Sequence, residues 1–188
     1  EVLGGQVVLR LPMPLPSRHW RSAASFFLRF VPSMLRMLNI GRSWRPDLVH
    51  VQCVGPNGLY ALIAATALRL PLVVTSQGEQ TMDAGQVYQR SAAQRWVLRQ
   101  LLRRAGAVTA CSAHTLRTVR RFGKLPPDAA VIPNGVDLVE FGGALPERPH
   151  HRRYVFAIGR HVWNKGFDLL LRAFAANAGP FPGVDLII

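Results

Sequence analysis

The chain has 188 residues, enough for one large domain or two small ones. Hydrophobic residues make up 49% and charged residues 18% of it, which excludes a disordered chain. The formal net charge is +13, carried almost entirely by arginine, so we expect anionic partners: nucleic acid, anionic lipid or phosphorylated substrates. The chain has no nucleic-acid-binding motif, so charge alone does not choose among these partners.

The two cysteines, Cys53 and Cys111, are far apart and show no metal-ligand spacing. This predicts two reduced thiols in a reducing compartment. The longest uncharged apolar run, near 59–68, is too short to span a bilayer, and no signal peptide opens the sequence. The sequence starts without methionine and ends in a strand-like run, so we expect a fragment of a longer chain.

The first part of the chain predicts a weak strand at Gln6–Leu11 and an amphipathic helix over Trp20–Arg42. We expect Pro32 to kink this helix or divide it. Because arginines occupy one face, the helix could lie on an anionic membrane surface. The alternative, which we favour, is that its apolar face packs on the domain's own sheet.

From residue 46 onward, apolar runs alternate with helical patterns. Asn57 and Ser112 are predicted helix caps, and Trp96, Val97, Leu101 and Leu102 are predicted to point inward. This order predicts an α/β fold, a Rossmann-like doubly wound parallel sheet with helices on both faces. The predicted strands are Leu48–Cys53, Leu72–Ser76, Ala107–Cys111 and Ala129–Ile132, and the predicted helices Leu59–Arg69, Gln89–Arg104 and Ala113–Phe122.

A stretch in which apolar residues do not recur at a regular spacing separates these strands and helices from the C-terminal part of the chain. We predict a first domain over 1–145, a linker over 146–153, and the beginning of a second domain over 154–188. In the second part, Tyr154–Arg160 reads as a buried parallel strand and Phe167–Phe174 as a helix, with a further strand at Val184–Ile188. This is the first βαβ unit of a second Rossmann-like domain.

The loop between Tyr154–Arg160 and the helix after it holds Arg160 and Lys165, with Gly159 and Gly166 at its ends. A planar guanidinium and a mobile ammonium together suit a phosphate or diphosphate. The alternative is two solvated cations, and it is the better interpretation for Arg160 alone. It is weaker for Lys165, because the chain has only one other lysine, Lys124.

A second candidate site lies where the strands of the first domain end. Gly55 and Asn57 follow one predicted strand, and Gln77, Gly78 and Glu79 follow the next. The carboxyl ends of parallel strands meet at the ligand crevice, which predicts that these residues come together. Asn57 could instead be a helix cap only. His50, which lies within a strand, is better explained as a core histidine bonded to a backbone carbonyl.

Three segments carry a family resemblance: Val131–Asp137 (VIPNGVD), Phe156–Arg160 (FAIGR) and Asn164–Asp168 (NKGFD). In order and spacing they resemble retaining glycosyltransferases of the GT-B fold, family 4. The resemblance implies that Arg160 and Lys165 contact the diphosphate of a nucleotide-sugar donor. It also implies that Asn134 lies in a segment that closes the first domain beside the cleft.

The sequence departs from that family at several points. Gln77 stands where the family often has a histidine, so a proton-transfer role at this position is in doubt. In the mechanism that the resemblance implies, the departing diphosphate takes the acceptor proton. The sequence ends before the family's later loop with two glutamates, and the family's glycine-rich loop after the first strand is not visible near its start, so we expect this polypeptide alone to be inactive or nearly so.

The resemblance implies a hexosyltransferase-type enzyme that uses a nucleotide-diphosphate sugar, retains configuration and requires neither metal nor cofactor. We expect a lipid-linked, polysaccharide or small-molecule glycan acceptor, and a role in polysaccharide biosynthesis. The expected location is the cytoplasm, with peripheral contact at the inner, anionic face of the membrane and no specific nucleic acid. The alternative is a non-catalytic basic module that binds anionic polymer or membrane.

Overall fold

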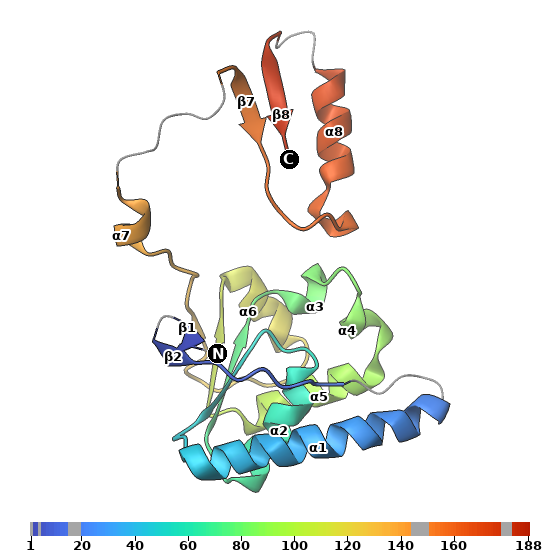
Figure 1. Ribbon diagram of the computed structural model, residues 1–188, viewed down its shortest axis with the longest axis vertical. Helices are drawn as coiled ribbons and strands as arrows, with labels where there is room; N and C mark the ends of the chain where they lie inside the picture. The colour runs from blue at the N-terminus through green and yellow to red at the C-terminus, as the bar shows by residue number, and fades with distance from the viewer. Residues whose placement is uncertain (1, 4, 15–19, 144–150, 178–181) are drawn as a thin grey trace. The chain divides into compact units, whose positions relative to one another are not determined.

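The computed structural model describes residues 2–3, 5–14, 20–143, 151–177 and 182–188 (Figure 1). The chain divides into two compact units. The first comprises Glu1–Thr81 and Gln86–Pro133, and the second comprises Met82–Gly85 and Asn134–Ile188. Most of the predicted linker, 146–153, lies outside the described residues.

The first unit is built on a sheet of four parallel strands in the order β3-β4-β5-β6. Apolar residues stand side by side across it, since Val51 pairs with Val74 and Val74 with Val108. The α/β class with a parallel sheet is confirmed. The strands are β3 (Val49–Gln52), β4 (Leu72–Ser76), β5 (Ala107–Ala110) and β6 (Ala130–Val131).

Helices connect consecutive strands: α2 (Asn57–Ala67), α5 (Ala92–Arg104) and α6 (Ala113–Arg120). Two short helices, α3 (Glu79–Met82) and α4 (Val87–Arg90), precede α5. The predicted helix Gln89–Arg104 is therefore wrong at its start, because the Ser91 hydroxyl accepts a hydrogen bond from Gln94 N and begins a new helix there. The Ser112 cap is confirmed by the same kind of bond from Thr115 N.

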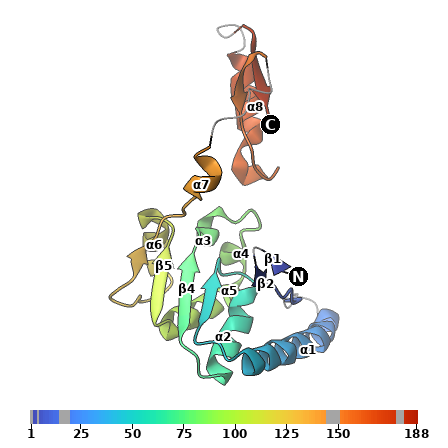
Figure 2. The same ribbon diagram turned by 60° about the vertical axis from the view of Figure 1, so that its left-hand side comes forward.

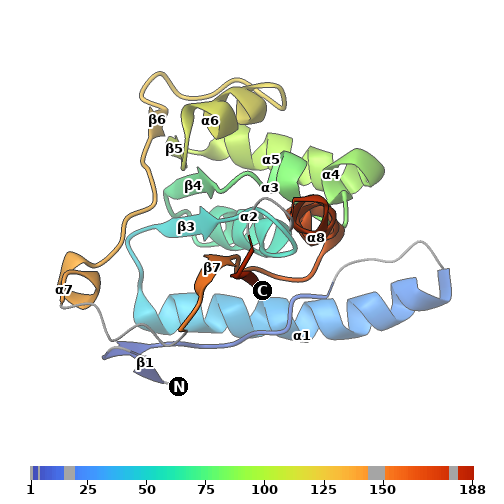
Figure 3. The ribbon, with the colours of Figure 1, turned by 90° about the horizontal axis from the view of Figure 1, so that it is seen from above.

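One face of this sheet carries the core. Val51, Val74 and Val108 share one buried cluster with residues of α2, α5 and α6. On the opposite face His50 and Gln52 are exposed. Figures 2 and 3 show α2, α5 and α6 on one side of the sheet. The strand order runs in one direction, so each right-handed crossover returns to the same face. Helices on both faces, as predicted, are not found among the described residues.

Four residues of α5 were predicted to point into the core, and three of them do. Val97, Leu101 and Leu102 are buried. The prediction for Trp96 is wrong, because its side chain is 53% exposed.

The helix α1 (Trp20–Trp44) runs unbroken through Pro32, so the predicted division is wrong. Pro32 is exposed, where a missing backbone N–H costs less than in a core. α1 packs on α2, where Met34, Tyr60 and Ala64 form a second buried cluster. Tyr60 donates a hydrogen bond to the Pro14 carbonyl (3.1 Å), and burial raises the pKa of its phenol above the ordinary value.

Among the described helices, none is both long and apolar enough to cross a membrane. The N-terminal strands β1 (Val2–Leu3) and β2 (Gln6–Val7) form a small antiparallel pair, so the predicted strand at Gln6–Leu11 is present but shorter.

The second unit contains the short helix α7 (Leu138–Phe141) and a βαβ arrangement of β7 (Arg153–Phe156), α8 (Phe167–Ala176) and β8 (Val184–Ile187). β7 and β8 are parallel, which confirms the predicted unit. The prediction that β7 is buried is wrong: Val155 is 43% and Phe156 is 58% exposed. In the described residues only β8 pairs with β7, so most of its surface stays open.

Candidate functional site

The two candidate clusters lie in different units. In the first unit, the loops after β3 and β4 stand at the carboxyl edge of the sheet, because these strands are parallel neighbours. Gly55 and Asn57 therefore lie at the same edge of the sheet as Gln77, Gly78 and Glu79.

Glu79 ties these two loops to each other. Its Oε1 accepts from the backbone N–H of Val54 (2.9 Å), which lies in the loop after β3. Its Oε2 accepts from the backbone N–H of Gln77 (2.7 Å), in its own loop. A carboxylate that accepts backbone donors in this way makes strong, charge-assisted bonds. Glu79 therefore acts as a clamp between the loops, and its oxygens are already engaged.

A second bond from Gln80 supports the clamp. The Gln80 side-chain amide donates to Glu79 Oε1 (3.0 Å), and its oxygen lies 2.8 Å from the Ser76 hydroxyl, which can donate to it. Ser76 and Gln80 are buried, at 1% and 2% exposure, so this network is shielded from water. The sequence prediction missed both residues. The available signal was a polar Thr75–Ser76 pair at the end of an otherwise apolar strand.

Asn57 stabilises the loop after β3 rather than capping a helix. Its Oδ1 accepts from the backbone N–H of Gly55 (2.7 Å), and its amide donates to the Gln52 carbonyl (3.1 Å). The predicted capping role is wrong, because Pro56 occupies the N-cap position of α2. The Gly55 carbonyl in turn accepts from the side chain of Gln94 (2.9 Å).

Gly78 has a backbone conformation that favours glycine. Its φ is +96°, and the residue is buried. This turn carries the chain from Gln77, whose side chain is half-buried, into α3 at Glu79. The tight turn accounts for glycine at this place without a ligand.

His50 is exposed and is not a core residue, so that prediction is wrong. Its Nε2 lies 2.7 Å from the Thr75 hydroxyl, which lies 2.6 Å from the Thr109 hydroxyl. The partner is a side chain on the open face of the sheet, not a backbone carbonyl.

In the second unit, Gly159, Arg160 and Lys165 lie together in the loop from β7 to α8. Backbone bonds from Val162 N to the Arg160 carbonyl (2.8 Å) and from Lys165 N to the Val162 carbonyl (2.9 Å) fold this loop. It ends in the 3-10 helix η1 (Trp163–Lys165) and at Gly166, whose φ is +68°.

The two cations of this loop are available to an anion. Arg160 and Lys165 are exposed, and within the described parts of the chain no acidic side chain pairs with either. A Cβ on Gly159 would stand 3.4 Å from the Phe167 ring and 3.9 Å from the Lys165 stem, so that stem runs along the start of the loop. Asn134 is exposed and is the first residue of the segment Asn134–Ile188, outside the loop that holds Arg160 and Lys165.

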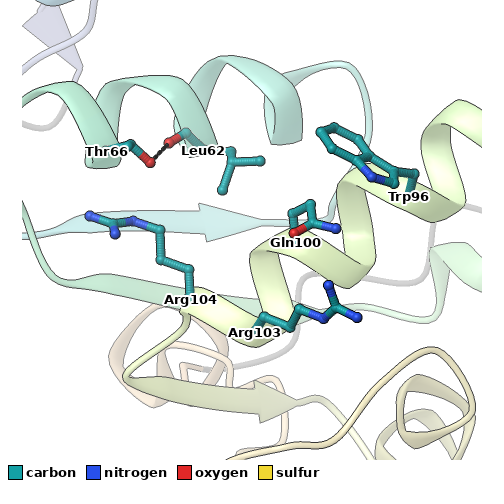
Figure 4. A pocket seen from close by; sticks show the side chains of 6 residues that line it. All are labelled: Leu62, Thr66, Trp96, Gln100, Arg103 and Arg104. Carbon is teal, nitrogen blue, oxygen red and sulfur yellow. Dashed lines mark hydrogen bonds between the residues drawn. The ribbon is translucent and has the colours of Figure 1, made fainter.

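A shallow hollow of about 440 Å³ lies between α2 and α5 (Figure 4), and none of the predicted site residues lines it. Arg104 there donates to the Ala65 carbonyl (2.8 Å), which makes it a partner of the α2 backbone. Within the described residues, no group of three His, Cys, Asp or Glu side chains could hold a metal ion.

The fold and these loops define an α/β protein of Rossmann-like type with polar loops at the carboxyl edge of its parallel sheet. Comparison with protein families gives a match to the glycosyl transferase 4-like domain over residues 1–135. The chain belongs to this family, and the domain implies transfer of a sugar from a donor to an acceptor. A search of curated proteins found no match.

Proposed function

We propose that the protein transfers a hexosyl unit from a nucleotide-diphosphate sugar to a glycan acceptor, with retention of configuration and without a required metal. The family match over residues 1–135 carries the proposal. The lipid-linked, polysaccharide or small-molecule nature of the acceptor, a place in polysaccharide synthesis and work at the cytoplasmic face of a membrane are parts of the same proposal.

The proposed donor site is the loop between β7 and α8 in the second unit. Arg160 and Lys165 are exposed cations on one short loop, and a diphosphate carries the opposite charge. In the reaction, the bond between the anomeric carbon and the diphosphate oxygen breaks and a bond to the acceptor oxygen forms. The acceptor proton passes to the departing diphosphate. The two cations stabilise the negative charge that develops there, and such electrostatic stabilisation is usually the largest catalytic contribution.

The proposed acceptor site is the edge of the first unit. This site is lined by Gly55, Asn57, Gln77 and Gly78. Glu79 holds its two loops in place. Gln77 offers both a donor and an acceptor to a sugar hydroxyl but does not titrate. This suits a mechanism in which the leaving group, and not the protein, takes the proton.

The two lysines of the chain provide a matched test. We expect Lys165→Met to lower kcat/KM by about a hundredfold, because the loss of one group that stabilises developing charge typically costs that much or more. Lys124→Met removes the same charge from an exposed position of the first unit and should leave turnover unchanged. Release of nucleotide diphosphate from a panel of donor sugars, measured on the full-length protein, is the readout.

Two results would contradict the proposal. Equal turnover of both lysine variants would remove Lys165 from the donor site. Absence of transfer or donor hydrolysis with every donor, together with salt-sensitive binding to anionic polymer, would favour a non-catalytic basic module.

A further inference from the structure

The helix α1 exposes a stripe of large apolar side chains. Phe27, Val31 and Leu35 recur every four residues and so share one face, and Leu28 adjoins them. Their exposures are 59%, 47%, 54% and 76% in the order Phe27, Val31, Leu35 and Leu28. We call these four residues the α1 stripe. A contiguous group of this kind on a helix differs from single exposed apolar residues, which are common.

The stripe is additional to the face that holds α1 in the fold. Phe26 and Met34 are buried, and Met34 packs with Tyr60 and Ala64 of α2. A Cβ on Gly41 would collide with the Leu68 side chain, so the helices are also close at that end. The stripe therefore remains exposed in a helix that is already docked.

The charge around the stripe is of one sign. Residues 2–46 contain seven arginines and no acidic residue. Arg29 and Arg36, seven residues apart on one face of α1, are both exposed. Arginine stems can extend along an apolar surface while the guanidinium reaches a polar layer. A second copy of this helix would bring like charges together, whereas an anionic surface would be attracted.

We infer that the α1 stripe enters the headgroup region of an anionic lipid bilayer, with α1 in the plane of the surface and its arginines on lipid phosphates. Phenylalanine and leucine on one face and arginine on another are typical of helices that lie in this interface. The inference rests on the proposed work at a membrane and names the surface for it. It does not depend on the donor or the acceptor.

Vesicle co-sedimentation of the full-length protein tests this inference. Vesicles of equal phosphatidylglycerol and phosphatidylcholine should bind it, and vesicles of phosphatidylcholine alone should bind it much more weakly. The double change Phe27→Ser with Leu35→Ser should weaken binding at least tenfold, because it removes two large apolar groups from the interface. The double change Arg29→Gln with Arg36→Gln should weaken binding to the anionic vesicles about fivefold per arginine.

Matched changes elsewhere control for composition and charge. Trp96→Ser removes an apolar side chain of similar exposure (53%) from α5, and Arg117→Gln with Arg120→Gln removes two exposed arginines from α6. Neither control should alter vesicle binding. All these side chains are exposed, so circular dichroism and urea unfolding should match the unchanged protein.

The inference is overturned if the stripe variant and the Trp96 control bind equally, or if both kinds of vesicle bind equally. It is also overturned if the protein is a dimer that the stripe variant converts to monomer without any vesicle binding. Release of nucleotide diphosphate from the donor panel separates the two proposals. Vesicle binding without transfer or donor hydrolysis with any donor keeps the α1 surface and refutes the proposed function. Turnover without vesicle binding keeps the function and refutes the α1 surface.

Discussion

At the scale of single residues, Glu79 has the clearest consequence for stability. Glu79→Gln would replace one carboxylate oxygen with an NH₂ group that faces a backbone N–H, at Val54 or at Gln77. Because that donor would lose its acceptor, we expect the free energy of unfolding to fall by about 1–3 kcal/mol. Urea unfolding measures this change.

Asp128→Asn is the control for this substitution, since it makes the same chemical change at an exposed position of the first unit. Its effect should stay within about 0.5 kcal/mol. An unchanged unfolding free energy for Glu79→Gln would show that the clamp contributes nothing to stability.

The sequence predicted which residues gather at this edge but not what each one does. Gln77, Gly78 and Glu79 were placed correctly, because polar residues that follow a buried parallel strand must lie at its carboxyl end. The role of Glu79 depends on Val54 N, which belongs to another strand's loop, and no local pattern reports that contact. Asn57 was misread as a cap because the rule for caps considers one helix at a time, whereas the actual acceptor bond is to Gly55 N.

At the scale of helices, Gly58 allows α2 to approach α5. A Cβ there would stand 2.9 Å from Val54, 3.1 Å from Leu101 and 3.3 Å from Val97, all buried side chains. Alanine is a better helix former by about 1 kcal/mol, but overpacking a core costs about 1–3 kcal/mol. We expect Gly58→Ala to destabilise the first unit by about 1 kcal/mol net, as measured by thermal or urea unfolding.

Gly106→Ala is its comparison, because the nearest atom to a Cβ there is the Leu72 carbonyl oxygen at 3.9 Å, an ordinary contact. A stabilising Gly58→Ala would mean that Val54 and Leu101 can move aside.

The apolar runs of the sequence predicted where strands begin and end. They did not predict which residues at the margin of a helix's apolar face are buried. The bounds of the strand Leu72–Ser76 agree with the prediction, since a short run rich in β-branched residues stands there between Pro71 and the polar loop that begins at Gln77. Trp96 and Val97 are adjacent in the same helix, and periodicity alone does not say which lies at the limit of the buried arc. The unbroken helix through Pro32 reflects its solvent-facing position, which only the packing of α1 on α2 determines.

At the scale of the whole molecule, repulsion between positive charges is not offset by an equal number of negative charges. There are 23 lysines and arginines for 10 acidic residues, a net charge of +13, so the charges of the chain repel one another on average. The ion pair between Arg152 and Asp185 is 3.6 Å long, and its arginine side chain is 69% exposed, which makes it a weak contributor. Added salt should therefore raise the free energy of unfolding, because it screens repulsion.

Urea unfolding in sodium chloride from about 20 to 200 mM, a range over which the screening length falls several-fold, measures this effect. Sodium sulfate at matched ionic strength serves to separate screening from specific anion binding. Stability that falls as salt rises would mean that attractive pairs outweigh the net charge.

The clamp between the loops also bears on the thermodynamics of ligand binding. Glu79 joins the loop after β3 to the loop after β4 through bonds to the backbone of each. At the proposed acceptor site a ligand would meet two segments fixed as one, so little conformational entropy would be lost on association. Such pre-organisation keeps more of the interaction energy as affinity, and it makes recognition depend on the fit of a fixed surface rather than on a loop that folds around its ligand.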